Sequence, residues 1–203
     1  MIKHVLLDAM GVLFTVGDDT NELLIPFVQA KNPAAEREEI RTHYHRACLG
    51  EISSRAFWEA VGLGGEFPYI ETEYPYTQLH INREIYTVLP RLSAKYHLSI
   101  LSNDVAEWSE VLQQKYLLKA FFSPNVISGS VGLRKPDPAI YRYALTQLQA
   151  DAGECVFVDD REQNLLPARE LGMHVFRFGE QTDADQVPCV STFSQLCDAL
   201  DRL

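Results

Sequence analysis

Four short runs of hydrophobic residues alternate with segments of helical periodicity along the chain. The runs cover residues 2–7, 98–101, 155–158 and 174–178. Short runs that are hydrophobic on both faces are typical of strands in a parallel sheet, because the connecting helices cover both faces of such a sheet. The pattern therefore predicts an α/β protein with a parallel sheet between two layers of helices.

A long stretch without a convincing strand separates the first run from the second. Its helical patterns cover residues 20–31, 33–49, 54–61 and about 76–95. The stretch is too long for a crossover of one helix. We predict a small helical cap inserted after the first strand, formed by residues 16–82, and a core domain formed by residues 1–15 and 83–203. The expected hinges lie near residues 15–18 and 76–82.

The composition limits the class of protein and its partners. The chain has 203 residues, of which 46% are hydrophobic, and its 18 basic and 28 acidic residues give a formal charge of −10. This charge disfavours nucleic acid and acidic membranes as partners. No hydrophobic run approaches the ~20 residues needed to span a bilayer, and no secretion signal is evident. We expect a cytoplasmic monomer or weak homodimer that acts on a small molecule.

The four cysteines show no close pairing of the kind that binds a metal. They are Cys48, Cys155, Cys189 and Cys197. We expect buried, reduced thiols, with Trp58 and Trp108 packed in the cap and the core.

Polar residues stand where several of the predicted strands end. Asp8 follows the first run, Ser102 follows the second, and the pair Asp159-Asp160 follows the third, while Lys135 precedes a Pro-Asp-Pro turn. The carboxyl ends of parallel strands meet at one edge of the sheet, where ligands of such folds bind. These segments therefore predict one shared site.

The residue types suit the handling of a phosphoryl group. A carboxylate such as Asp8 can act as a nucleophile, and Gly11 permits a sharp turn that aims backbone N–H groups at an anion. Asp159 and Asp160 form an all-oxygen site of the kind that Mg²⁺ prefers. Lys135 supplies a compact positive charge.

Each residue alone has a simpler interpretation. A strand-ending Asp often caps a helix or turn, adjacent acids can form a solvated loop, and most lysines lie on the surface. Ser102 and Asn103 could supply a hydroxyl and amide donors to a phosphate, or could belong to a helix cap. The combination of the four segments favours the shared site.

The four motifs together resemble those of the haloacid dehalogenase-like (HAD) hydrolase superfamily, and they occur in the order of that family. The match is most detailed in Gly132-Leu133-Arg134-Lys135-Pro136 with Tyr141, in Asp159-Asp160-Arg161-Glu162-Gln163-Asn164 followed by Ala168-Arg169-Glu170-Leu171-Gly172, and in Gly50-Glu51-Ile52-Ser53 with Phe57. These segments are similar to the branch that contains a bacterial glucose-1-phosphate phosphatase and the N-terminal phosphatase domain of soluble epoxide hydrolase.

The resemblance implies a fold and a set of roles. The fold would be a three-layer α/β/α Rossmann-like core with a helical cap. The activity would be that of a Mg²⁺-dependent phosphatase of a small phosphorylated metabolite, of which a sugar phosphate is one candidate. Asp8 would form an aspartyl-phosphate. Mg²⁺ would be bound by Asp8, the backbone carbonyl of Met10, Asp160 and, directly or through water, Asp159. Phosphate would be bound by Ser102, Asn103 and Lys135, with Gly11 and Asn164 in supporting roles.

Met10 departs from the family pattern. Phosphatases of this superfamily usually carry an Asp at this position, which donates a proton to the leaving group, and a thioether cannot do so. The alternatives are a phosphate-binding pseudoenzyme with a regulatory role and a metal-independent 2-haloacid dehalogenase. Dehalogenases replace the acidic pair, however, and this chain keeps Asp159-Asp160. Asp18 or Asp19 is a candidate substitute donor.

The cap offers few motifs for substrate recognition. Arg41 or His43 could reach a substrate from the cap. His43 and His45 lie two residues apart, so they would not share a helix face and make a poor metal pair.

Overall fold

A parallel six-stranded sheet forms the centre of the protein. The computed structural model describes residues 1–182 and 186–203, and in this part of the chain the strand order is β3-β2-β1-β4-β5-β6. The strands are β1 (His4–Leu7), β2 (His97–Ser102), β3 (Val126–Ile127), β4 (Cys155–Asp159), β5 (His174–Phe178) and β6 (Cys189–Val190). All pairings are parallel, and Val5 of β1 lies between Leu98 and Val156. The predicted parallel sheet is confirmed.

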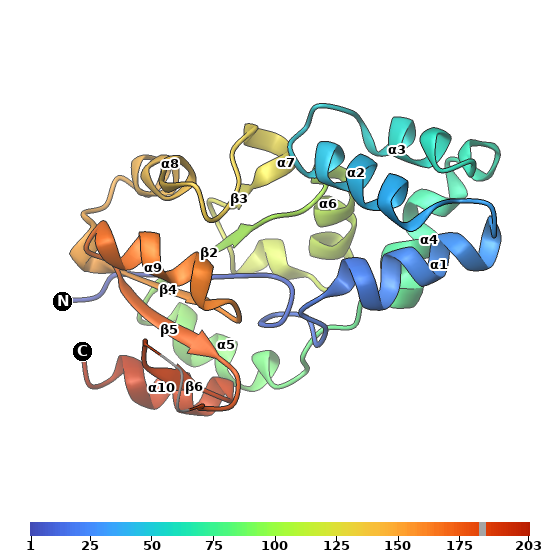
Figure 1. Cartoon of the computed structure of the whole chain (residues 1–203). Helices are drawn as coiled ribbons and strands as arrows, with labels where there is room; N and C mark the ends of the chain where they lie inside the picture. Colours follow the sequence, from blue (N-terminus) through green and yellow to red (C-terminus); the bar gives the residue numbers. More distant parts are fainter. Residues whose placement is uncertain (183–185) are drawn as a thin grey trace.

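Helices cover both faces of this sheet (Figure 1). The longer helices of the described chain are α1 (Ile25–Lys31), α2 (Arg37–Cys48), α3 (Ser54–Ala60), α4 (Tyr69–Gln78), α5 (Ile85–Ser93), α6 (Ala106–Lys115), α8 (Pro138–Leu148), α9 (Glu162–Glu170) and α10 (Phe193–Leu200), with a short α7 (Ser128–Val131). Val5 and Leu7 pack with α5, α6 and α10, whereas Leu6 packs with α8 and α9. Because successive strand residues point to opposite faces, the result is the expected three-layer α/β/α fold.

Local sequence signals explain where two of these helices begin. Asp137 accepts a hydrogen bond from the N–H of Ala139 at 2.8 Å, and a proline opens α8. Thr192 accepts one from the N–H of Gln195 at 3.1 Å at the start of α10. Each side chain satisfies a backbone donor that the helix itself cannot pair.

The sequence pattern missed three elements. Strands β3 and β6 contain only two residues each, too few to show a hydrophobic pattern. The helical pattern over about 76–95, with a hinge near 76–82, predicted a core helix, and α5 (Ile85–Ser93) lies there. Helix α4 begins at Tyr69, before that pattern starts.

Helices α1 to α4 lie together beyond the carboxyl ends of β1 and β2 (Figure 1). We call residues 16–82 the helical insertion. The two segments that join it to the rest run side by side: the N–H of Thr15 donates to the carbonyl of His80 at 3.0 Å, and the N–H of Asn82 donates to Leu13 at 2.8 Å. Whether these segments act as hinges between two domains stays a prediction.

An aromatic cluster attaches the helical insertion to α6. The ring of Trp108 in α6 lies 5.8 Å from Tyr44 in α2, 5.2 Å from Trp58 in α3 and 5.1 Å from Tyr74 in α4. All four side chains are buried. Trp58 and Trp108, expected in two separate units, thus belong to one hydrophobic core.

The remaining expectations from composition concern the membrane and the cysteines. In the described chain, no helix is both long enough and sufficiently apolar to cross a membrane. The four cysteines are free thiols; Cys48, Cys155 and Cys197 are buried and Cys189 is partly exposed.

Candidate active site

The strand ends bring three of the predicted site residues to one edge of the sheet. Asp8 directly follows β1, Ser102 ends β2 and Asp159 ends β4. Leu7 pairs with Ile100 on one side and Val158 on the other, and the N–H of Asp8 donates to the carbonyl of Val158 at 2.9 Å. The side chains that follow these strands therefore meet at the centre of the sheet.

Lys135 lies between two of the carboxylates. Its Nζ is 2.8 Å from Oδ1 of Asp8 and 2.7 Å from Oδ2 of Asp159, and the residue is only 2% exposed. Burial alone would lower the pKa of this ammonium, but the charges of Asp159 and Asp8 outweigh burial and raise its pKa. Lys135 is therefore a permanent positive charge at the site.

Asp8 is buried beside that charge. Its Oδ1 also accepts a hydrogen bond from the N–H of Ala9 at 2.6 Å. Burial raises the pKa of Asp8, with the charge of Asp159 acting in the same direction, while Lys135 opposes both. The ionised form of Asp8 is thus favoured by Lys135.

Asp159 is fully occupied by protein donors. Nδ2 of Asn164 lies 3.0 Å from each of its carboxylate oxygens, and the N–H of Arg161 donates to Oδ1 at 2.8 Å. Asn164 is itself positioned by the hydroxyl of Tyr141, which donates to its carbonyl at 2.6 Å. Asp159 is completely buried and serves to orient Lys135 and the acidic loop.

Asp160 has the opposite character. Its Oδ1 is buried and has no hydrogen-bond partner among the described residues. A Cβ atom at Gly11 or at Gly17 would lie 2.4 Å from its Oδ2, so only glycine fits at these two positions without a shift. Burial, together with the charge of Asp159, raises the pKa of Asp160 to about 6.

A cation would satisfy this arrangement of carboxylates. Oxygens of Asp8, Asp159 and Asp160 lie within 4.8 Å of one another. The unpartnered oxygen of Asp160 and the all-oxygen donor set fit a hard divalent ion such as Mg²⁺. The residues predicted to bind a metal are therefore close enough to do so.

A tight turn follows Asp8. Gly11 has a φ of 76°, which favours glycine, and its N–H donates to the carbonyl of Val16 at 2.9 Å. The guanidinium of Arg161 donates to the carbonyl of Gly17 at 2.7 Å and so connects this turn to the acidic loop. The side chain of Met10 is buried and borders the cavity described below.

Ser102 and Asn103 occupy different positions in the site. The buried Oγ of Ser102 has no hydrogen-bond partner among the described residues. Asn103 instead holds the backbone of Lys135, because its Oδ1 accepts from the Lys135 N–H at 2.8 Å and its Nδ2 donates to the Lys135 carbonyl at 2.9 Å. Binding of phosphate by these two residues stays a prediction.

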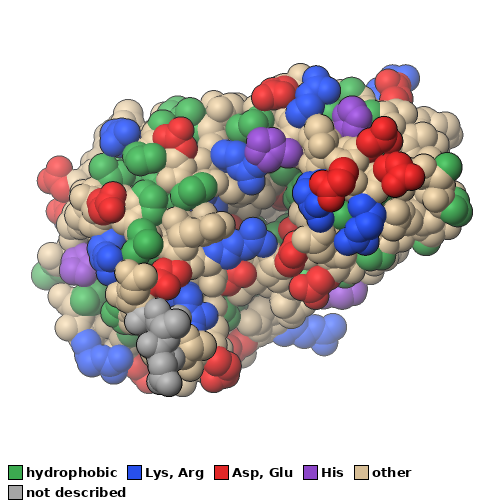
Figure 2. All heavy atoms as spheres, viewed as in Figure 1, with side chains coloured by type: hydrophobic (Ala, Val, Ile, Leu, Met, Phe, Trp, Pro, Cys, Tyr) green, Lys and Arg blue, Asp and Glu red, His purple; other side chains and the backbone are tan. Residues whose placement is uncertain are grey.

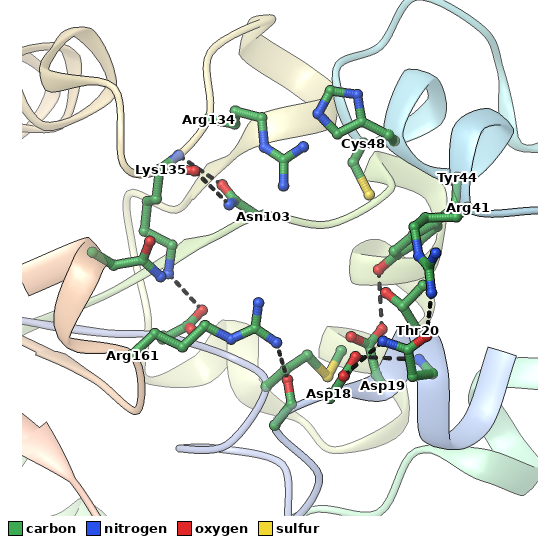
Figure 3. Close-up of a pocket in the computed structure, with 16 residues that line it drawn as sticks. Asp18, Asp19, Thr20, Arg41, Tyr44, Cys48, Asn103, Arg134, Lys135 and Arg161 are labelled. Carbon is green, nitrogen blue, oxygen red and sulfur yellow. Dashed lines mark hydrogen bonds and ion pairs between the residues drawn. The ribbon is translucent and has the colours of Figure 1, made fainter. Parts of the chain in front are cut away.

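A cavity of about 320 Å³ separates the strand ends from the helical insertion. Figure 3 shows Lys135 and Asn103 on one side of it and Arg41 and Tyr44 on the other. The space-filling view shows the hollow between the two parts of the molecule, with Lys and Arg side chains beside it (Figure 2). The residues that line it are Asp8, Met10, Gly17, Asp18, Asp19, Thr20, Asn21, Arg41, Tyr44, His45, Cys48, Asn103, Arg134, Lys135, Arg161 and Asn164.

The face of α2 that lines the cavity could have been found from the sequence. Arg41, Tyr44, His45 and Cys48 follow the spacing of one helix face, which excludes His43. Of the two cap residues that the sequence suggested, Arg41 borders the cavity and His43 does not. The sequence analysis did not identify Tyr44 or His45 as site residues, although helical spacing from Arg41 places them on the same face.

Asp19 is a buried acid on the insertion side of the cavity. Its Oδ2 accepts a hydrogen bond from the hydroxyl of Tyr44 at 3.0 Å, and burial raises its pKa to about 6. Asp18, in contrast, accepts hydrogen bonds from the backbone and side chain of Asn21. Of the two candidate donors, Asp19 is the one that is protonated more readily near neutral pH.

Known proteins match this chain over different lengths. A D-ribitol-5-phosphate phosphatase of Bacteroides thetaiotaomicron is 25% identical over 195 residues, which cover 87% of this chain and 92% of that protein. A bifunctional epoxide hydrolase 2 of Rattus norvegicus is 36% identical over 98 residues, and flavin mononucleotide hydrolase 1 of Arabidopsis thaliana is 36% identical over 66 residues. These two matches cover 46% and 32% of this chain but only 18% and 27% of those proteins.

Solved structures share the fold. A 2-haloacid dehalogenase of Pseudomonas syringae superimposes with a TM-score of 0.74 at 22% identity and covers 100% of this chain and 99% of its own. A HAD family enzyme of Bacteroides thetaiotaomicron, in complex with magnesium and inorganic phosphate, gives 0.71 at 21% identity and covers 91% and 98%. At these identities the likeness shows the fold alone.

A protein-family model matches most of the chain. The model for haloacid dehalogenase-like hydrolases matches residues 2–172, which include all four motifs and the helical insertion. The chain belongs to the haloacid dehalogenase-like hydrolase family.

Proposed function

We propose that the protein is a Mg²⁺-dependent phosphatase of small phosphorylated metabolites that works through an aspartyl-phosphate on Asp8. The observation that carries the proposal is the position of Lys135 between Asp8 and Asp159, next to the unpartnered oxygen of Asp160. A nucleophilic carboxylate, a fixed cation and a vacant carboxylate oxygen are what transfer of a phosphoryl group requires. The names of the ribitol phosphate and flavin mononucleotide relatives point the same way.

The reaction would take place in two displacements. An Asp8 oxygen attacks phosphorus while the ester P–O bond breaks, so the phosphoryl group moves to Asp8 and the alcohol leaves. Water then attacks the phosphorus of the aspartyl-phosphate, which releases inorganic phosphate and restores the carboxylate. Lys135 offsets negative charge in both steps, and the free hydroxyl of Ser102 is available to donate a hydrogen bond to a phosphoryl oxygen.

Asp8, Asp160 and the backbone carbonyl of Met10 would hold the metal ion, with Asp159 behind them. When bound there, Mg²⁺ supplies positive charge for the oxygens of the transferred group. The structural basis is the carboxylate cluster of Asp8, Asp159 and Asp160 and the raised pKa of Asp160, whose charged form gains a partner on binding a cation.

Asp19 would replace the proton donor that Met10 cannot provide. Both residues border the same cavity, and Asp19 lies with Tyr44 across from Lys135 (Figure 3). A carboxyl group with a pKa of about 6 is protonated often enough near neutral pH to protonate an alkoxide. In the second step its carboxylate can accept a proton from the attacking water.

The test is hydrolysis of an aryl phosphate by the purified protein with Mg²⁺. We expect release of phosphate that stops on chelation and is abolished in Asp8→Asn. The control is Asp198→Asn, an exposed carboxylate on α10, which should keep full activity.

Two outcomes would overturn the proposal. Phosphate binding without turnover on a broad panel of esters would support a pseudoenzyme with a regulatory role. Release of halide from a 2-haloacid in the presence of chelator would support a dehalogenase.

A further inference from the structure

Arg134 is a cation without a partner at the wall of the cavity. Its guanidinium has no hydrogen bond or ion pair to any described residue, although the side chain is only partly exposed. Burial lowers the pKa of Arg134, Tyr44 acts in the opposite direction, and the charge of Arg161 lowers the pKa further. A partly buried guanidinium that has no anionic partner and borders a cavity is available to bind an anionic group of a ligand.

The other two arginines of the cavity are partnered. Arg41 forms an ion pair with Glu38 and donates to Oδ1 of Asn21 at 2.6 Å. Arg161 donates to the carbonyl of Gly17, and its charge acts on Asp18, Asp19 and Asp160. Arg134 is therefore the arginine of this cavity that is left for a ligand.

Arg134 and Lys135 are adjacent in sequence, but their side chains point to different parts of the cavity. Asn103 holds the Lys135 backbone at both its N–H and its carbonyl, which fixes the direction of each side chain. Lys135 reaches Asp8 and Asp159, whereas the guanidinium of Arg134 extends into the space between Asn103 and Cys48 of the insertion (Figure 3). The transferred phosphoryl group, which must contact Asp8, lies on the Lys135 side.

A second cavity continues from the first at Arg134. It has a volume of about 330 Å³, and the residues that border both cavities are His45, Asn103, Arg134, Lys135, Arg161 and Asn164. The second cavity reaches Asp137 and Gln163 but not Asp8 or Met10. A substrate that places its phosphate at Asp8 thus has room for a further group at Arg134, where His45 also borders the cavity.

We propose that the natural substrate carries a second anionic group, a carboxylate or a second phosphate, which binds to Arg134 while the first phosphate binds at Asp8. This inference rests on the proposed phosphatase function. The planar guanidinium forms paired hydrogen bonds with either kind of oxyanion, so the chemistry of Arg134 fits both. Because the whole chain has a formal net charge of −10, a cationic subsite is a selective place for such a group.

Matched pairs of substrates test the inference. One pair is fructose 6-phosphate and fructose 1,6-bisphosphate, which differ by a second phosphate; the other is glycerol 3-phosphate and 3-phosphoglycerate, which differ by a carboxylate. The wild type should prefer the doubly anionic member of at least one pair in kcat/KM. Arg134→Gln should raise KM for that member by about 10- to 100-fold, the usual effect of losing a charged hydrogen bond, and change its singly anionic partner by less than about 3-fold.

The control variants separate charge from geometry. Arg46→Gln removes one positive charge from the same helix as His45, yet Arg46 pairs with Glu51 outside the cavity, so both pairs should behave as in the wild type. Arg134→Lys should restore only part of the preference, because an ammonium lacks the paired donors. Equal effects of Arg134→Gln on both members of each pair, or no preference in the wild type, would overturn the inference.

Calorimetry keeps this test independent of turnover. The same four compounds are titrated into Asp8→Asn and into the double variant Asp8→Asn with Arg134→Gln. Weaker binding of only the doubly anionic compounds in the double variant supports the subsite even if the wild type hydrolyses none of them, in which case the proposed phosphatase function fails alone. Identical binding in the two proteins overturns the subsite whatever the turnover.

Discussion

The two walls of the cavity are built differently. On the side of the strand ends, Lys135, Asp159 and Asn164 each make at least two polar contacts with one another or with Asp8. On the opposite wall the polar contacts of three side chains stay within the insertion: Tyr44 donates to Asp19, Asn21 donates to Asp18, and Arg41 donates to Asn21. Networks of satisfied buried groups are rigid. The charged groups at the strand ends are thus held in place independently of the insertion, which presents a separate set of polar side chains to the cavity.

The substitution Lys135→Met should have the largest effect on the buried charge network at the strand ends. The variant leaves Asp8 and Asp159 buried without their cation, so we expect the free energy of unfolding to fall by about 3–5 kcal/mol and activity to be lost. Urea denaturation measures the first and phosphate release the second. The matched control, Lys119→Met, breaks an exposed pair with Glu110 and should cost at most about 1 kcal/mol. Equal losses in the two variants would contradict the assigned role of Lys135.

The attachment of the opposite wall is tested by Trp108→Leu. Because this ring contacts three helices of the insertion, we expect a loss of about 3 kcal/mol in the free energy of unfolding, typical of truncating a buried aromatic ring. Limited proteolysis should then cut within residues 16–82 first. Tyr69→Leu, at a 69% exposed position in α4, is the control and should have little effect. Unchanged stability of Trp108→Leu would mean that other contacts hold the insertion in place.

The smallest expected effect concerns the acid on the insertion side. Asp19→Asn should slow an alkyl phosphate by about 10²-fold or more, at the lower end of what a positioned proton donor contributes, and slow an aryl phosphate less, because its leaving group needs no proton. The wild-type rate on the alkyl ester should fall as pH rises above about 6, since the donor must be protonated. Steady-state rates across pH check both statements.

A second substitution sharpens the same test. Adding Met10→Asp to Asp19→Asn should restore the alkyl ester more than the aryl ester, because it introduces a carboxyl group beside the reacting atoms. An unchanged ratio of the two rates in Asp19→Asn would show that Asp19 is not the donor.

The sequence predicted the side of the cavity at the strand ends better than the side formed by the helical insertion. Asp8, Ser102 and Asp159 follow hydrophobic strands, so chain order alone implied that they meet at one edge of the sheet. Lys135 was predicted at the same site from its place before a Pro-Asp-Pro turn, although nothing in the spacing says which way its side chain points. The position of the Asp160 carboxylate leaves no room for a Cβ at Gly11 or Gly17, and the sequence analysis singled out only Gly11.

The side of the cavity formed by the helical insertion depends on how its helices pack against one another, and the sequence pattern does not predict that packing. The pattern of α2 identifies one helix face but not what that face meets, so Tyr44 and the burial of Asp19 emerged only from the structure. Arg134 was part of a recognised motif, but its lack of a partner is a property of the folded surroundings. A motif gives the identity of a residue, and only packing shows whether its charge is already used.

The contact between the insertion and the core bears on how new specificities could arise in such enzymes. Oγ of Ser128 in α7 donates to the carbonyl of Cys48 at 2.5 Å, and a Cβ at Gly50 would lie 2.4 Å from the carbonyl of Gly129. Trp108 packs among the helices of the insertion, so the contact between the insertion and the core is as closely packed as a protein interior. A foreign insertion grafted onto this core would meet a void or a clash there. Exchange of insertions between relatives should therefore succeed only when the start of α7 and the turn of α6 that carries Trp108 are inherited with them.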